Sequence, residues 1–458
     1  MRERAREGWL YMRRSAAVVA MVLVAAIGVA ACGGSGSSGG SKTTASADLT
    51  KPVTLTVWSG FSERELGIWN NVLAGFHALH PAVKIKSVGA VDNNKIVAAI
   101  RGGNPPDVAL SFETDKTGAF CSSGGWIDLN PYIKRDNVDI SQFPPAVQTY
   151  TKFEDKRCAM PDLADVYGIY YNKAMLQKAG ISSPPKTMSE LAADAKKLTQ
   201  RNSDGSIKVA GFIPNEGFYE NAAAHWAPLW DAQWTDAQGK STLATSPGWG
   251  KWLQWDKQLV DFYGYKTLKR FIAGAGQEFS ASNAFETGKV AMILDGEYRT
   301  AFIKAEHPGL DYGTAPMPVD DGQPDIYGGG YVVGNTLGIP KGAKNTGVAW
   351  ELIKYLSTNT KALTELAEGL GNVPTTPASS KATKLNEDPH FQPFLKIFTS
   401  PHTQTNPIVA SGDADQLLFH TFIENWEAGK VPDLQKGLQG VDKQIDAQLE
   451  NATAGSAP

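Results

Sequence analysis

The strongest constraint on the fold is an alternation of strand and helix patterns that begins near residue 50. Residues 53–58 alternate apolar and β-prone side chains, which predicts a strand, and apolar residues recur at helical spacing over 66–76. Residues 83–88 alternate again, and a short helix over 94–101 leads to a third strand over 107–110. This order implies right-handed crossovers and a parallel or mixed sheet.

A second α/β series follows in the middle of the chain. Residues 167–171 read as a strand, 173–179 and 189–200 as helices, and 209–213 and 290–294 as further strands. Two lobes of this kind, placed face to face, create a cleft that is lined by strand ends and loops. The pattern therefore predicts a two-lobed α/β protein with an interlobe ligand cleft.

The amino terminus reads as a secretory signal. Arg13 and Arg14 precede an uncharged run over 15–31, and the small residues before Cys32 resemble a lipobox, where the signal is cut before a lipid-bearing cysteine. We predict a signal peptide over 1–31 and a lipidated Cys32, carrying palmitate or a similar lipid, at the start of a flexible linker over 32–49. The alternatives are a simply cleaved or uncleaved signal with an incidental cysteine, and translation may start at Met12. The predicted location is the extracytoplasmic face of the cell membrane, with a lipid anchor.

Composition bounds the rest of the chain. About 410 residues follow the linker, enough for two lobes of normal size. The formal net charge is −3, and the signal holds five Arg and two Glu, so the mature chain carries −6. No clustered basic face suggests a nucleic-acid partner. Eleven of the 12 Trp lie after the signal, a rich supply for packing or for gripping a flat ligand.

The cysteines divide into one lipid-bearing residue and one pair. Cys121 and Cys158 should form a disulfide in an oxidising exterior, closing a loop of about 37 residues. Two buried free thiols are the alternative.

Several weak motifs occur together in one order between residues 50 and 440. Among them are 103–108 (Gly-Asn-Pro-Pro-Asp-Val), 170–181, 187–198, 285–292, 339–345 with the helix over 349–356, and 371–375. Together they resemble the extracellular solute-binding proteins of ABC importers, in the sugar-binding family that includes maltose-binding protein.

The resemblance implies a periplasmic-binding-protein type II fold in which the chain crosses between lobes three times. The crossings should lie near 164–167, 330–336 and 371–375. The implied N-terminal lobe comprises 50–165 and 334–372, and the C-terminal lobe 166–333 and 373–458. It also implies a monomer that captures a sugar or oligosaccharide in the cleft and delivers it to a membrane permease with a separate ATPase. No enzyme activity, cofactor or metal is expected.

A sugar site needs aromatic platforms for the apolar C–H face and carboxylates or amides for the hydroxyl rim. On the first lobe, Trp58, Ser59 and Gly60 end the first strand, and Glu113 follows the third. By resemblance the first of these loops contacts ligand. Trp58 could instead be a core residue, and Glu113 a solvated loop charge.

The candidates on the second lobe lie near the crossings and strand ends. They are Asp165, Tyr167, Trp230, Trp234, Asp295, Glu297, Tyr298, Gly329, Gly330 and Tyr331. Asp165 could serve only as a cap. Trp226, Trp230 and Trp234 are spaced by four, and such a stripe is more often core than platform. The row at Trp249, Trp252 and Trp255 is better explained by core packing. Glu297 and Tyr298 stand where many family members carry a stacking Trp, which suggests more polar readout.

Other functions remain open at this point. Asp295 and Glu297 could form a glycosidase pair, because residues two apart in a strand lie about 7 Å apart. Only the resemblance weighs against it. His77 and His80 show no metal-binding spacing. A non-sugar solute such as a glycerophosphodiester or polyol, and a surface adhesin or a sensor's ligand-binding partner, are the alternatives.

Overall fold

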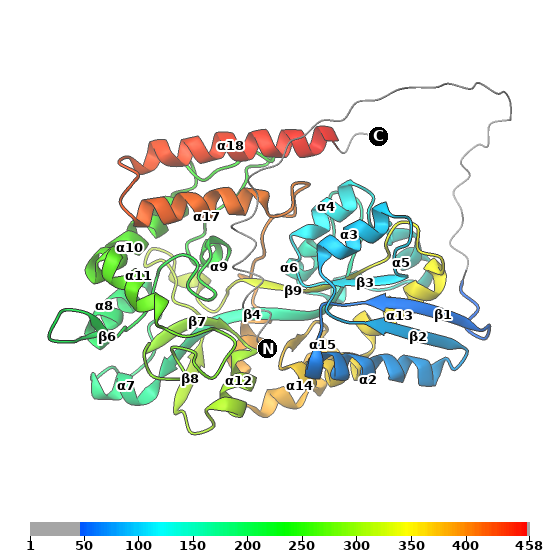
Figure 1. Ribbon diagram of the computed structural model, residues 1–458, viewed down its shortest axis with the longest axis horizontal. Coiled ribbons are helices and arrows are strands. Elements are labelled where there is room, and N and C mark those ends of the chain that lie inside the picture. Colours follow the sequence, from blue (N-terminus) through cyan, green and yellow to red (C-terminus); the bar gives the residue numbers. More distant parts are fainter. Residues whose placement is uncertain (1–45, 456–458) are drawn as a thin grey trace, which may run out of the picture. The chain divides into compact units, whose positions relative to one another are not determined.

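One continuous eight-stranded sheet runs through the protein, as the computed structural model of residues 46–455 shows (Figure 1). Its path of hydrogen-bonded strands is β10-β4-β9-β3-β1-β2, and two further strands, β7 and β8, pair with β4. The predicted signal peptide and Cys32 lie outside the described residues.

The first lobe follows the order that the sequence predicts. Its elements are β1 (Val53–Trp58), α2 (Glu63–Leu79), β2 (Val83–Val88), α3 (Asn93–Arg101) and β3 (Val108–Ser111). β1 pairs in parallel with both β2 and β3, so the three strands end at one edge. Helix α2 buries Trp69, Val72, Leu73 and Phe76, which lie on one helical face. The Asp92 side chain caps α3 by accepting a hydrogen bond from the Lys95 amide at 2.8 Å.

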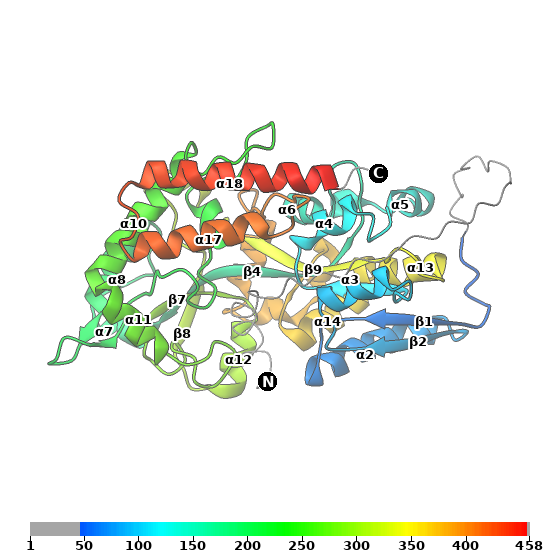
Figure 2. The same ribbon diagram turned by 45° about the horizontal axis from the view of Figure 1, so that its top comes forward.

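Strand β4 (Met160–Asn172) belongs to both lobes. Its first half pairs in antiparallel fashion with β9 (Val332–Gly338), and its second half pairs with β7 (Met292–Gly296) and β8 (Tyr312–Ala315). The short strand β10 (Val373–Pro374) joins β4 at Leu163 and Ala164. Figures 1 and 2 show β4 and β9 running from one lobe into the other. The three predicted crossings are therefore neighbours in one sheet.

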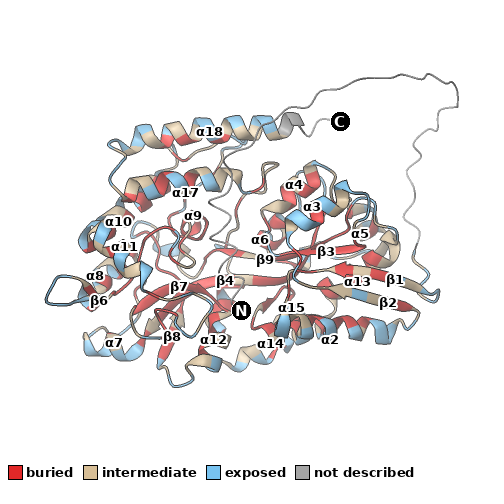
Figure 3. Ribbon diagram, viewed as in Figure 1, coloured by how far each residue is buried: buried red, intermediate tan, exposed pale blue. Residues whose placement is uncertain are grey.

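The other helices within residues 46–455 surround this sheet, whose central strand β4 is largely buried (Figure 3). They are α4 (Lys116–Ser122), α5 (Asn130–Asp136), η2 (Ile140–Gln142), α6 (Pro145–Tyr150), α7 (Lys173–Lys178), α8 (Met188–Leu198), α9 (Ala223–Trp226), η3 (Ala227–Leu229), α10 (Pro247–Tyr263), α11 (Tyr265–Ala273), α12 (Arg299–Glu306), η4 (Pro324–Ile326), α13 (Thr346–Thr358), α14 (Thr360–Leu370), α15 (Pro377–Ala382), η5 (Lys384–Glu387), α16 (Gln392–Thr399), α17 (Ala414–Glu427) and α18 (Leu434–Gly455). Helix α18 packs on α17 at the outside. None of the helices in the described part of the chain has the length and apolarity needed to cross a membrane.

One predicted strand of the second lobe is wrong. The sequence predicts a strand over 209–213, but the structure has a hairpin of β5 (Gln200–Arg201) and β6 (Ile207–Val209), followed by a single bridge from Ala210 to Val290. A Cβ on Gly211 would lie 2.0 Å from the Ala195 carbonyl oxygen. The chain therefore runs tightly against α8 here and does not continue as a strand.

The two rows of tryptophans in the sequence, one from Trp226 and one from Trp249, have different structures. In α10, Trp249 and Trp252 are fully buried, which confirms their predicted core role. The row that begins at Trp226 does not form one helical face. Pro228 has no N–H to continue the helix, so α9 ends at Trp226 and a 3-10 turn follows.

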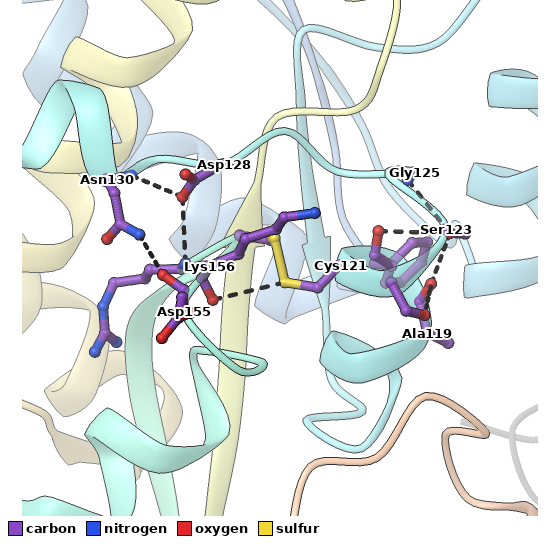
Figure 4. Close-up of a disulfide and its surroundings, with 12 residues drawn as sticks. Ala119, Cys121, Ser123, Gly125, Asp128, Asn130, Asp155 and Lys156 are labelled. Atoms are coloured by element: carbon purple, nitrogen blue, oxygen red, sulfur yellow. Dashed lines mark hydrogen bonds between the residues drawn. A yellow bond between two sulfur atoms is a disulfide. The ribbon is translucent and has the colours of Figure 1, made fainter. Parts of the chain in front are cut away.

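The disulfide that the sequence predicts is present (Figure 4). Cys121 near the end of α4 is bonded to Cys158, two residues before β4, with their Cα atoms 5.6 Å apart. Both residues are buried beside Trp126, whose ring stacks on Phe120 at 4.4 Å. The bond ties helix α4 to the segment just before the strand that both lobes share.

Replacing both Cys121 and Cys158 by Ala should lower the free energy of unfolding by about 3–4 kcal/mol, because the unfolded chain then gains the entropy of an open loop. Urea unfolding of the two proteins measures this difference. Reductant should shift the midpoint of the wild type and leave the double variant unchanged. Equal midpoints for wild type with and without reductant would contradict the expectation.

Candidate ligand-binding site

The first lobe presents an aromatic ring at the edge where its parallel strands end. Phe112 directly follows β3 and is 38% exposed, and its ring lies 5.0 Å from that of Phe61. A Cβ on Gly60 would lie 2.3 Å from the Phe112 ring, so the loop after β1 needs glycine at this position. Phe112 was not predicted as a site residue, although it stands beside Glu113 at the end of a strand.

The predicted residues of the first lobe differ in exposure. Trp58 is half-buried and packs against the cluster around the disulfide, whereas Ser59 is fully buried. Glu113 is exposed, and its carboxylate lies 3.9 Å from the ammonium of Lys116. Glu113 is therefore the predicted residue of this lobe that is most open to solvent.

A pocket of about 280 Å³ lies between the loop after β3 and helices α9 and α17. Its lining is Asp115, Glu216, Ala222, Ala223, Ala224, Asp413, Gln416, Leu417 and His420. Lys116 on the first lobe forms an ion pair with Asp413 at 2.5 Å, which links the two lobes beside the pocket. None of these lining residues was predicted from the sequence, because they come from four separate segments.

Three rings gather where the lobes meet. Tyr167 on β4 and Tyr331 just before β9 lie on either side of His225 in α9, with ring centroids 4.1 Å and 4.7 Å from the imidazole. Burial lowers the pKa of His225 to about 4, so the imidazole is neutral at pH 7. Tyr167 and Tyr331 thus occupy one cluster, as expected from their positions at two crossings.

Carboxylates surround these rings on the second lobe. Asp295 at the end of β7 is fully buried, accepts a hydrogen bond from Arg299 at 2.7 Å and has its pKa raised to about 6 by burial. Tyr298, two residues after β7, donates a hydrogen bond from its hydroxyl to Glu220 at 2.5 Å. Arg299 also pairs with Glu286 at 3.2 Å, so a single guanidinium serves two buried carboxylates.

A second group of polar side chains joins the first and third crossing segments to the end of β7. Asn372, beside β10, donates its amide to Asp165 on β4 and, at 3.0 Å, to Glu297 after β7. Glu297 also accepts the Val166 amide at 2.6 Å. Burial, helped by the nearby charge of Glu220, raises the pKa of Asp165 to about 7. One side-chain amide therefore holds two acids together at the hinge.

Gly329 and Gly330, at the second predicted crossing, lie close to residues 402–404. A Cβ on Gly329 would lie 2.6 Å from His402, and the Gly329 amide donates to the Ile326 carbonyl at 3.1 Å. The Gly330 carbonyl accepts the Gln404 amide at 2.9 Å. These glycines allow the 402–404 segment to pack against the second crossing.

Trp230 and Trp234 lie in the core of the second lobe. They are 5% and 8% exposed. The Trp230 ring lies 6.0 Å from Trp255, and Trp234 packs edge-on against Trp249 at 4.6 Å. Their contact with ligand stays a prediction.

Six of the predicted residues therefore share one site in this structure: Asp165, Tyr167, Asp295, Glu297, Tyr298 and Tyr331. The site also includes Glu220, His225 and Glu278, which were not predicted. Glu220 and Glu278 lie in loops and His225 in the one-turn helix α9, all too short for a periodic pattern to signal a role.

Two α/β lobes that share three crossing strands, with a polar and aromatic site at the junction, define a solute-binding protein of the two-lobed class. The chain belongs to the family of bacterial extracellular solute-binding proteins, whose model matches residues 62–362. Diacetylchitobiose binding protein DasA of Streptomyces coelicolor is 26% identical over 384 residues, which are 80% of this chain and 84% of that protein.

Two further comparisons agree with this assignment. The maltotriose-binding protein of Pyrococcus abyssi is 22% identical over 342 residues, covering 73% of this chain and 69% of that protein. The structure of CpMnBP1 with mannobiose bound has a TM-score of 0.75 at 26% identity, covering 86% of this chain and all (100%) of that chain. The structural likeness extends over nearly all of the described residues.

The raised pKa of Asp165 predicts how the folding stability depends on pH. The folded protein holds this proton up to about pH 7, whereas an ordinary aspartate releases it near 3.8, so folding takes up a proton between these values. The free energy of unfolding contributed by Asp165 should fall as the pH rises from about 4 to 7. Asp165→Asn should flatten this slope in urea unfolding at several pH values. Asp325→Asn, at an exposed position, is the control, and equal slopes for Asp165→Asn and wild type would contradict the assignment.

Proposed function

We propose that the protein is the substrate-binding component of an ABC importer and captures a sugar or oligosaccharide between its lobes. The observation that carries this proposal is the junction site, where aromatic rings and carboxylates from separate segments meet at the strands that both lobes share. Aromatic rings suit the apolar face of a sugar, and charged acceptors bind its hydroxyls strongly. The sugar ligands in the names of the relatives support the same class.

The proposed contacts are divided between the lobes. On the first lobe they are Trp58, Ser59, Gly60, Phe112 and Glu113. On the second lobe and the hinge they are Asp165, Tyr167, Trp230, Trp234, Asp295, Glu297, Tyr298, Gly329, Gly330 and Tyr331. A ligand that touches both sets at once favours the closed arrangement, because only that arrangement makes all the contacts.

We propose no catalysis at this site. Asp295 is engaged by Arg299 and by its neighbouring backbone amide at 2.8 Å, and Glu297 by the Val166 amide and Asn372. A glycosidase needs one carboxyl group free to donate a proton and a second free to attack or to activate water. Release of reducing sugar from a panel of glycosides would contradict this.

A phosphate-bearing solute, such as a glycerophosphodiester, is less well supported. Arg299 is fully buried and already pairs with Asp295 and Glu286. An anionic ligand would therefore approach a site with an excess of carboxylates. A polyol remains compatible with the same polar groups, and an adhesin would bind no small solute.

The partners and the location complete the proposal. We propose that the signal over 1–31 is removed, that Cys32 carries the lipid, and that the linker over 32–49 tethers the folded lobes to the outer face of the membrane. The lobes would comprise 50–165 with 334–372 and 166–333 with 373–458. A monomer would present its closed form to a permease, and ATP hydrolysis would belong to a separate subunit.

Calorimetry of the purified protein with oligosaccharides, polyols and glycerophosphodiesters tests the ligand class. At least one saccharide should bind, and Phe112→Ala should weaken it by about tenfold through loss of an aromatic platform. Phe262→Ala removes an aromatic ring of similar exposure, 36%, on α10 and should bind as wild type. Binding of a phosphodiester but of no saccharide would replace the proposal, and failure of every small solute would favour an adhesin.

Replacing Cys32 by Ala tests the anchor. The lipid would be lost, so the protein should move from the membrane fraction to the medium or soluble fraction and still bind its saccharide. Immunoblots of the fractions and calorimetry of the released protein measure both properties. A Cys32→Ala protein that stays with the membrane contradicts the lipid anchor.

A further inference from the structure

Three carboxylates converge at the end of β7. Glu220, Glu278 and Asp295 each offer one oxygen, and these oxygens lie within 4.8 Å of one another. The three residues come from separate segments of the second lobe. Asp295 is paired with Arg299, but among the described residues no lysine or arginine forms an ion pair with Glu220 or Glu278. The cluster therefore gathers three carboxyl groups around one guanidinium, and burial raises the pKa of Glu278 well above its usual range.

Buried polar atoms at this place lack partners. One carboxylate oxygen of Glu278 is buried and has no hydrogen-bond partner among the described residues. His225 is 8% exposed, neither of its ring nitrogens has a hydrogen-bond partner, and its Nε2 lies 3.7 Å from Glu220. Buried groups without partners cost free energy, and the approach of His225 to Glu220 places one of them beside the cluster, which indicates that a ligand completes it.

We propose that the cluster binds a protonated amine of the solute, so that the preferred ligand is a saccharide with a cationic amino group. This inference rests on the proposed function and specifies its ligand. An ammonium has three N–H donors, and oxygens that lie within 4.8 Å of one another are close enough for one such nitrogen to reach them together. The amine would supply the positive charge that the site lacks.

The surrounding aromatic rings fit a sugar that carries such an amine. Phe279 is 48% exposed, and its ring lies 5.8 Å from that of Tyr298, which itself donates to Glu220. These rings can cover the apolar face of the sugar and also attract a nearby cation. The exposed ring of Phe279 thus lies next to the tyrosine that bonds Glu220, whereas Asp295 lies buried behind them.

A divalent metal ion fits the same place less well. The guanidinium of Arg299 lies 2.7 Å from the carboxylate of Asp295 and would repel a doubly charged ion about twice as strongly as an ammonium. Tyr298 already donates a hydrogen bond to one oxygen of Glu220. A carboxylate oxygen that accepts this bond can still accept an N–H group, but it is a weaker ligand for a metal ion. A metal site is kept as an outcome of the test.

The test compares ligands that differ at one group. Chitobiose, N,N′-diacetylchitobiose and cellobiose share a β-1,4-linked pair of rings and carry an amine, an acetamide or a hydroxyl at C2. In calorimetry with the full mature protein, chitobiose should bind at least about tenfold more tightly than the two neutral disaccharides. If cellobiose does not bind, the comparison uses the saccharide that does bind and its 2-amino counterpart. Equal or tighter binding of the neutral sugar overturns the inference.

Variants locate the effect in the cluster. Glu278→Gln and Glu220→Gln keep the size of the side chain and remove its charge, so each should reduce the preference for the amine over the neutral sugar by about tenfold. Glu365→Gln, on an exposed face of α14, should leave the preference unchanged. Circular dichroism checks that each variant is folded. An unchanged preference in both cluster variants would overturn the assignment to these residues.

The remaining outcomes separate the two proposals. If neutral saccharides bind and amino saccharides do not, the inference about the amine fails and the proposed function stands. If no saccharide binds, both fail. If calcium or manganese chloride alone binds with a stoichiometry of one and a chelator reverses it, the cluster is a metal site and the amine is rejected.

Discussion

The rest of the structure depends on the antiparallel pairing of β4 with β9. β4 is 13 residues long; it pairs with β9 up to Val166, with one irregularity between Pro161 and Ala164, and with β7 from Tyr167 onward. The stretch between these two pairings carries Asp165 and Tyr167 into the candidate site. A ligand bound at the proposed site would therefore contact the strand that both lobes share.

This arrangement places acidic groups where water cannot stabilise their charge. Asp295 and Glu286 share the guanidinium of Arg299, and Asp165 shares the amide of Asn372 with Glu297. Buried charges without full compensation reduce folding stability, and binding proteins commonly accept such a cost at the site that must recognise a ligand. The disulfide between Cys121 and Cys158 offsets part of it by restricting the unfolded chain near the start of β4.

Much of the first lobe could be predicted because its elements are amphipathic and regular. The row at Trp69, Leu73 and Phe76 predicts α2, and alternation predicts β1 and β2. The second lobe was harder. The strand predicted over 209–213 is largely absent because Gly211 packs against Ala195, in a helix that ends at Leu198. Propensity describes local preference, and a tertiary contact overrides it.

The sequence by itself determined the strand and helix order of the first lobe, the pairing of the two cysteines and the core role of the α10 tryptophans, since these follow from periodicity and from residue chemistry. Only the tertiary structure decided that Glu220, His225 and Glu278 join Asp295 in one cluster. Glu220 and Glu278 lie in loops and His225 in a helix of one turn, so no period marks them, and only the tertiary packing brings them to Asp295 on β7. Local patterns report which face of an element is buried, whereas a binding site is formed by residues distant in sequence that the sheet brings together.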